Sequence, residues 1–332
     1  MTDRELRDLL TDAVADVEPG HALDEIRART TTTKRRWPYA AGGAVLAVAA
    51  SFAAVAVLGN GTTPLAPDPG STTSSSPTAT DTGSATETPS QVVAVYYVGD
   101  TPDGLRLYRE FRPAAGELSA LEVGIEMVLS SPPLDVDYHS MWPRTGADLR
   151  SAEVRDGVIR IELAEAATQT HALPESERRA AIEQLIYTAQ AAIQERLPVQ
   201  FLVNGNPSAE ILGLPASEPL SNGPVLDTLA HVSLTSPAEG MLVDNDEPLV
   251  VEGVGNSFEG NIVTRIEEWD GTPVLDWEPT IAGWGEDKLF PFEVTLDLTD
   301  VPPGDYAVAS RTDDPSGQGR FHSDSKSITV VD

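Results

Sequence analysis

The chain has 332 residues, of which 52 are acidic and 22 are basic, and its formal net charge is −30 at pH 7. Proteins that bind nucleic acids contact the phosphates with clustered lysines and arginines. A chain this acidic is therefore not a general nucleic-acid-binding protein. The absence of cysteine excludes disulfides, thiolate metal sites, a cysteine nucleophile and a lipidated cysteine anchor. The length is sufficient for two domains of ordinary size.

The N-terminal part contains one long apolar segment. Residues 38–58 carry no charge, and their number matches the roughly 20 residues that a helix needs to cross a membrane. A basic triplet at 34–36 precedes them directly. The positive-inside rule therefore predicts a cytoplasmic stub over residues 1–36, a transmembrane helix over 37–58 and an extracytoplasmic remainder. A cleaved signal peptide is the competing interpretation. Both the apolar segment and the stretch before it are, however, longer than the corresponding regions of a typical signal peptide.

Residues 59–90 differ in composition from the rest of the chain. They consist mainly of threonine, serine, proline, glycine and alanine, and they contain no aromatic residue. Such a segment cannot bury enough apolar area to offset its conformational entropy, so we expect a disordered linker. In the stub, apolar residues between Leu6 and Val17 follow helical spacing. They predict a short amphipathic helix, which would contact a cytosolic factor if the protein were a transmembrane regulator.

Strand and helix patterns begin at Gln91 and continue to Leu214. Runs of β-branched and alternating residues predict strands, and apolar residues at helical spacing predict two helices. The order ββαββαβ predicts an α+β domain over residues 91–214, with both helices on one face of a sheet. The expected strands cover residues 92–98, 105–111, 149–154, 158–163 and 199–203, and the expected helices cover 118–130 and 174–196.

Residues 229–332 carry only strand patterns. Apolar residues alternate from Phe290 to Leu298, and a proline-glycine turn at 301–304 separates this strand from the next. About seven short strands in about 100 residues predict an all-β immunoglobulin-like sandwich. Because the chain has no cysteine, the core of this sandwich must rest on packing alone. The candidate core residues are Trp269, Trp277, Phe292 and Tyr306.

The first folded region resembles a known family in several phrases of its sequence. These are LYREFRP at 107–113, VLSSPP at 128–133, SMWPRTGADLRSAEVRDGVIRIEL at 140–163 and VNG at 203–205. They resemble the GerMN domain of spore-germination and sporulation proteins of the GerM type. The family usually has a glycine before the proline that ends the first helix, whereas Ser131 precedes Pro132 here. The resemblance implies an α+β module that takes part in protein assembly.

The second folded region resembles the germination-associated immunoglobulin-like domain of the Gmad type. The resemblance lies in SPAEGMLV at 236–243 and in residues 248–275, and it is most specific at Gly253, Gly255, Phe258 and Glu259. Combined with the predicted anchor, the two resemblances favour a non-catalytic, membrane-anchored, extracytoplasmic binding or scaffolding protein, and they imply cell-envelope, sporulation or germination-related assembly as its process. The partners expected are envelope proteins or cell-wall glycan, with self-association left open. A peptidoglycan- or carbohydrate-binding protein and a transmembrane regulator are the alternatives.

No catalytic site and no cofactor are expected from the sequence. The five histidines are scattered without metal-binding spacing, and the chain contains neither a nucleophile-elbow motif nor a zinc-binding HExxH helix. These observations predict that the protein is not an enzyme.

Two groups of residues are candidates for ligand binding. Trp269, Trp277 and Trp284 lie near carboxylates in the predicted sandwich, and aromatic rings of this kind stack on sugars when they do not pack in a core. Asp244, Asp246 and Glu247 form a dense group of oxygen ligands of the type that Ca²⁺ prefers. A similar alternation at Asp135, Asp137 and His139 is interpreted as a solvated turn, since acidic turns are expected in so acidic a chain.

Overall fold

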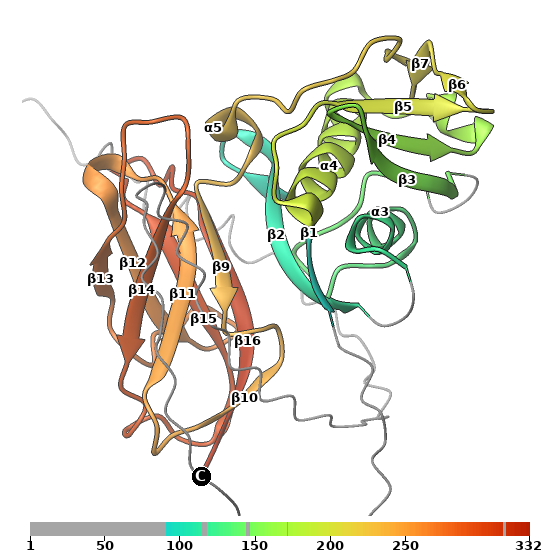
Figure 1. Cartoon of the computed structure of the whole chain (residues 1–332). Helices are drawn as coiled ribbons and strands as arrows, with labels where there is room; N and C mark the ends of the chain where they lie inside the picture. The colour runs from blue at the N-terminus through green and yellow to red at the C-terminus, as the bar shows by residue number, and fades with distance from the viewer. Residues whose placement is uncertain (1–90, 115–117, 144–146, 171, 315–316) are drawn as a thin grey trace, which may run out of the picture. The chain divides into compact units, whose positions relative to one another are not determined.

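The computed structural model describes residues 91–114, 118–143, 147–170, 172–314 and 317–332 (Figure 1). The predicted stub, transmembrane segment and linker, residues 1–90, lie outside the described residues. Among the helices that are described, none is both long and apolar enough to span a membrane. The described residues all belong to one compact unit. Within it we call residues 91–214 the α+β domain and residues 229–332 the β-sandwich.

The α+β domain begins with a long antiparallel hairpin, β1 (Gln91–Thr101) and β2 (Gly104–Ala114). The turn between the strands uses Gly104, whose φ of +98° is accessible to glycine at little cost, and the Thr101 hydroxyl donates a hydrogen bond to the Gly104 carbonyl over 2.7 Å. The sequence predicted both strands. The hairpin forms a two-stranded sheet of its own, so one edge of β1 is left without a strand partner.

The two predicted helices are present as α3 (Ala120–Ser130) and α4 (Glu175–Ile193). The α3 helix starts with a capping box, in which the Ser119 hydroxyl accepts from the Glu122 N–H and the Glu122 carboxylate accepts from the Ser119 N–H. The α4 helix ends where Gln194 adopts a left-handed conformation with φ of 58°. The helices pack on each other and on β1.

Buried polar groups of α4 complete the free edge of β1. The Tyr96 N–H donates to the Thr188 hydroxyl over 3.0 Å, and the Gln184 side-chain amide donates to the Tyr96 carbonyl over 3.0 Å. An unpaired backbone group in this interior would cost free energy, and these two side chains remove that cost. Trp142, in the motif at 140–163, also bonds to this helix: its indole N–H donates to the Ala181 carbonyl of α4 over 2.6 Å.

A second sheet in this domain has the order β3-β4-β5-β6. Strands β4 and β5 pair in parallel, because α4 and the short helix η1 form the crossover between them. The expectation of two helices on one face of a single sheet was therefore wrong: the hairpin β1–β2 and the four-stranded sheet are separate. The remaining elements of this region are β3 (Leu149–Arg155), β4 (Val158–Leu163), η1 (Glu165–Thr168), β5 (Val199–Val203), β6 (Asn206–Pro207), β7 (Glu210–Ile211) and β8 (Leu214–Pro215). The short helix α5 (Val225–Thr228) lies in the segment that connects the two domains.

The second region is a sandwich of two sheets, as the sequence predicted. One sheet has the order β10-β16-β15-β12-β13 and the other has the order β14-β11-β9 (Figure 1). Its elements are β9 (Val232–Ser236), β10 (Met241–Asp244), β11 (Leu249–Gly255), η2 (Phe258–Gly260), β12 (Asn261–Glu267), β13 (Glu278–Ile281), β14 (Phe290–Leu296), β15 (Gly304–Thr312) and β16 (Ser323–Val331).

Two of the four predicted core aromatics are in the sandwich core. Phe292 and Tyr306 are buried, and the Tyr306 hydroxyl donates to the Pro302 carbonyl over 2.8 Å. The prediction for Trp269 was wrong, since this side chain is 66% exposed in the turn after β12. Trp277 is half-buried against cations, with the guanidinium carbons of Arg265 and Arg311 at 4.2 Å and 3.6 Å from the ring centroid. Cation–π attraction rather than core packing therefore holds this ring.

The glycine at 253 has a packing role in this sandwich. A Cβ atom there would lie 2.6 Å from the Phe292 ring and 2.8 Å from the Ser233 carbonyl oxygen. The close packing of Phe292 on β14 and Ser233 on β9 against β11 therefore requires a residue without a side chain at this position. Gly253 also stands at the register shift in the pairing of β11 with β9.

We predict that Gly253→Ala lowers the free energy of unfolding of Thr80–Asp332 by about 1–3 kcal/mol, because the added methyl group overpacks the core. Urea unfolding followed by circular dichroism measures this change. Val250→Ala on the same strand is the matched control, since Val250 is half-exposed and its truncation should cost less than about 1 kcal/mol. Equal effects of the two substitutions would contradict the packing role.

Candidate functional site

The α+β domain and the β-sandwich meet where β2 runs beside β9 (Figure 1). The Ala230 N–H donates to the Leu107 carbonyl over 3.0 Å, which ties the start of the sandwich to β2 by a backbone hydrogen bond. Arg109 continues this contact: its N–H donates to the Ser233 hydroxyl over 3.3 Å, and its guanidinium donates to the Thr235 hydroxyl over 3.0 Å. The junction is thus built from strand edges as well as from side chains.

Glu110 on β2 positions the loop that enters this junction. Its carboxylate is buried and accepts hydrogen bonds from the Leu134 N–H over 2.7 Å and from the Asp135 N–H over 3.1 Å. Arg112 pairs with the same carboxylate over 3.1 Å. At the other end of the loop, His139 exchanges two backbone hydrogen bonds of 2.8 Å with Val98. The loop is therefore fixed at both ends against the hairpin.

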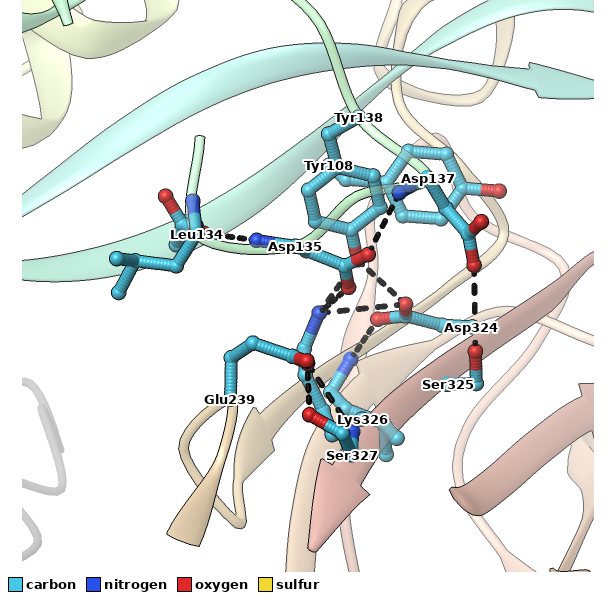
Figure 2. Close-up of polar contacts among 12 residues, drawn as sticks. Tyr108, Leu134, Asp135, Asp137, Tyr138, Glu239, Asp324, Ser325, Lys326 and Ser327 are labelled. Carbon is cyan, nitrogen blue, oxygen red and sulfur yellow. Dashed lines mark hydrogen bonds and ion pairs between the residues drawn. The ribbon is translucent and has the colours of Figure 1, made fainter. Parts of the chain in front are cut away.

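The fixed loop directs Tyr138 toward the sandwich (Figure 2). Its ring stacks on Tyr108 with centroids 4.8 Å apart, and its hydroxyl donates a short hydrogen bond to the Asp324 carboxylate on β16. The Tyr108 hydroxyl donates to the Ser323 carbonyl over 3.0 Å. Two tyrosines of the α+β domain thus bond to the first residues of β16.

Lys326 occupies the centre of this contact. Its Nζ donates to Asp135 Oδ2 over 2.5 Å and to Tyr138 Oη over 2.8 Å, and it lies 3.5 Å from Asp324 Oδ1 (Figure 2). Asp135, Asp324 and Lys326 are only 3–4% exposed. We call Asp135, Tyr138, Asp324 and Lys326 the junction cluster. It joins one carboxylate from each domain to a single buried ammonium group.

Alternation along β16 explains how the strand serves both the junction and the core. Side chains at every second position share a face, so His322, Asp324 and Lys326 face one way together with the apolar residues Ile328 and Val330. All five are buried. The polar half of this face contacts the α+β domain, and the apolar half belongs to the sandwich core.

Burial and mutual charge shift the pKa values in and near the junction cluster. Burial raises the pKa of the Asp324 carboxyl and that of the neighbouring Asp137. Burial alone would lower the pKa of Lys326, but the Asp324 and Asp135 carboxylates outweigh it and hold the pKa above its ordinary value. Burial also raises the pKa of Tyr138, which keeps its hydroxyl protonated as a donor.

We predict that Lys326→Met lowers the free energy of unfolding by about 3–5 kcal/mol, because the two buried carboxylates of Asp135 and Asp324 lose the ammonium group that they share. Urea unfolding of Thr80–Asp332 measures the loss, and we expect the single transition to separate into two as the domains uncouple. Lys288→Met is the matched control. Lys288 forms an exposed ion pair with Glu286, which contributes only about 0–1 kcal/mol. Similar losses in both variants would contradict the importance of the cluster.

A stacked histidine pair extends the junction next to the cluster. The rings of His231 and His322 are parallel within 5°, with centroids 4.1 Å apart. The His231 backbone N–H donates to His322 Nδ1 over 3.1 Å, so neutral His322 carries its proton on Nε2, which faces Asp103 Oδ2 at 3.2 Å. Arg320 pairs with the other oxygen of Asp103 over 2.5 Å. Asp103 in the β1–β2 turn is thus held by two residues of the sandwich.

His322 makes the stability of the junction depend on pH. Burial, followed by the nearby His231, lowers the pKa of His322 to about 4 from 6.5. The unfolded chain therefore binds a proton between these two pH values while the folded chain does not, and acidification through this window favours unfolding. The raised pKa values of Asp324, Asp137 and Glu239 act in the opposite sense, because these groups take up protons first in the folded state.

We predict that the contribution of His322 amounts to a loss of roughly 2 kcal/mol between about pH 6.5 and about pH 4. The difference in unfolding free energy between the wild type and His322→Gln isolates this contribution, because the carboxylates are common to both chains. The wild type should lose more stability than the variant as the pH falls. Parallel pH profiles would contradict the prediction.

A pocket of about 470 Å³ adjoins the histidine pair. Asp103 contributes to its wall from the α+β domain, Leu226 from the connecting segment, and the sandwich provides the other lining residues. Among these are two exposed rings, Phe258 and Trp284, whose centroids lie 5.9 Å apart. The volume falls within the range of small-molecule binding sites, about 300–1,000 Å³.

The three predicted sugar-binding tryptophans have different surroundings. Trp284 lines the pocket and is 56% exposed, whereas Trp269 is an exposed turn residue outside the lining and Trp277 is held by two arginines. The structure does not bring them together on the pocket wall. Of the three tryptophans, only Trp284 lines the pocket.

The predicted cation ligands lie at the end of β10. Asp244 Oδ1 accepts a hydrogen bond from the Asp246 N–H over 2.9 Å, and the Glu247 N–H donates to the Asp244 carbonyl over 3.3 Å. This geometry is that of a self-bonded acidic turn. Within the described part of the chain, no group of three or more histidine, aspartate or glutamate side chains is placed to hold a metal ion. Calcium binding at these residues stays a prediction.

Sequence reasoning missed the junction cluster. The alternation at Asp135, Asp137 and His139 was interpreted as a solvated turn, but Asp135 is buried and bonded to Lys326. The signal available in the sequence was the spacing of His322, Asp324 and Lys326, which continues the alternation of the last strand into polar residues. A lysine on the inward face of a strand implies a buried carboxylate partner.

Two family models match the chain at the two domains. Residues 94–209 match the family described as sporulation and spore germination, and residues 231–318 match the immunoglobulin-like domain of bacterial spore germination. The described part is therefore a tandem of two germination-associated domains. More particularly, it is a GerM-type GerMN domain followed by a Gmad-type immunoglobulin-like domain, as the sequence predicted. Neither family description names an enzymatic activity.

Similar solved structures are distant. The tandem GerMN domains of the sporulation protein GerM from Bacillus subtilis are 16% identical with a TM-score of 0.33, covering 45% of this chain and 50% of that one. An endo-β-1,4-mannanase from Thermotoga petrophila is 13% identical with a TM-score of 0.23, covering 49% and 37%. This chain thus spans only half the length of the GerM structure, and scores this low support no argument. A comparison with curated proteins finds no match.

Proposed function

We propose that the protein is a non-catalytic scaffold of the cell envelope that acts in sporulation- or germination-related assembly. The observation that carries this proposal is the junction cluster, because it fastens the GerMN domain to the immunoglobulin-like domain through buried charges from both. Domains that act independently need no such contact. Domains fastened in this way present one combined surface, which suits a protein that other components assemble on.

The state of the histidine in the pocket favours binding over catalysis. A general base needs a ring nitrogen that is free to take a proton from a nucleophile. In His322, Nδ1 accepts from the His231 backbone and Nε2 bonds to Asp103. Its low pKa further weakens it as a base near neutral pH. The pocket is therefore suited to holding a ligand rather than to transforming one.

The proposal places residues 91–332 outside the cytoplasmic membrane, anchored by residues 37–58 with the N-terminus in the cytoplasm. Its partners are envelope proteins or cell-wall glycan, and a second copy of the chain is one of the partners to be tested. The excess of 30 negative charges disfavours adsorption to anionic polymers, so contacts with the wall must be specific.

The proposal is tested by complementation in the organism that carries the gene. A strain in which the gene is deleted should show a defect in envelope or spore assembly, and the full chain should restore it. A chain that lacks residues 1–58 remains in the cytoplasm and should fail to restore it. The variant Lys326→Met should restore it poorly although both domains are present, whereas Lys288→Met should restore it fully.

The location is measured separately with an epitope tag placed after Asp332. Protease added to intact protoplasts should remove the tag from the full chain if the domains lie outside. Protection of the tag, or complementation by the cytoplasmic form, would overturn the proposal.

A further inference from the structure

The pocket beside the histidine pair has an aromatic wall that the protein itself leaves uncovered. Phe258 on η2 and Trp284 are 51% and 56% exposed, and their rings meet at a tilt of 53°. Large exposed aromatics next to a concavity are unusual on a surface that touches nothing, since covering them is favourable. Rings presented in this way offer flat faces to a ligand that carries C–H groups or positive charge.

The charges around this aromatic wall are mainly negative. Four carboxylates line the pocket against one guanidinium, that of Arg320, which is already paired with Asp103. The other three carboxylates are those of Glu286, Asp287 and Asp313. Asp287 accepts two backbone hydrogen bonds from α5, and Glu286 pairs with the exposed Lys288. The electrostatic potential in the pocket therefore favours a cation and opposes phosphates and carboxylates.

The two features together select one chemical class. A sugar ring places its C–H face on an aromatic ring while its hydroxyls donate to carboxylates, and a protonated amine gains further from both groups. We propose that this pocket binds a saccharide with a free, protonated amino group. An N-acetylated sugar has the same ring but lacks the charge, so it binds more weakly. The relevance of this ligand in the cell rests on the proposed extracytoplasmic location, where wall glycan is accessible.

The proposal is tested by calorimetric titration of the full chain, purified in a detergent without a sugar headgroup. The probes are the β-1,4-linked tetramer of glucosamine and its fully N-acetylated counterpart, at about pH 6, which is above the pKa of His322. The glucosamine tetramer should bind at least about tenfold more tightly than the N-acetylated one, and added salt should weaken it. Equal binding of the two, or binding of neither, would overturn the proposal.

Matched variants separate binding in the pocket from general attraction to an acidic protein. Trp284→Ala should weaken binding of the glucosamine tetramer about tenfold or more, whereas Trp284→Tyr, which keeps an aromatic face, should retain most of it. Trp269→Ala is the control, since Trp269 is also exposed but lies outside the pocket lining. Asp313→Asn should reduce the preference for the free amine.

Similar losses in Trp284→Ala and Trp269→Ala would show that the tetramer adheres to the surface at large, and would overturn the proposal. Circular dichroism checks that each variant is folded, which the exposure of both tryptophans leads us to expect. Because these measurements use purified protein, their failure leaves the complementation and protease results untouched. The two proposals therefore fail independently.

Discussion

Placing the Lys326 ammonium in a site only 4% exposed would cost several kcal/mol without compensation. The compensation comes from two carboxylates in different domains, Asp324 beside it on β16 and Asp135 on a loop of the GerMN domain. Neither domain alone satisfies this lysine. The stability of β16 therefore depends on how the two domains are docked. The histidine pair and the pocket adjoin the same strand, so they depend on the docking as well.

Each part of the junction is positioned by ordinary backbone geometry. The period of two along β16 places His322, Asp324 and Lys326 on one face, and Glu110 holds the facing loop through two backbone N–H groups. Tyr138 bridges them, because its ring stacks on Tyr108 while its hydroxyl reaches Asp324. A charged contact of this kind is specific in direction and register, which a purely apolar contact between the same strands would not be.

The sequence predicted the elements well and the junction poorly, for a common reason. Alternation in β4 and β14 and the helical spacing of apolar residues in α3 are local patterns, and the structure follows them. The separation of β1–β2 from the second sheet depends on Gln184 and Thr188 completing the edge of β1, which no local pattern reveals. Asp135 and Lys326 are 191 positions apart, so no local pattern links them. An aspartate in a loop with no visible partner is expected to be solvated.

The shared origin of the pocket wall has a thermodynamic consequence. Asp103 belongs to the GerMN domain, and through its bonds to Arg320 and His322 it fixes residues of the sandwich that line the pocket. Suppose that a ligand binds more tightly when the two domains are docked than when they are apart. Its binding must then stabilise the docked state by the same free energy by which docking strengthens the binding. Ligand affinity and domain docking are then thermodynamically linked. A substitution at Lys326 that weakens the docking would therefore lower the affinity of the pocket for its ligand, although Lys326 is not part of the pocket lining.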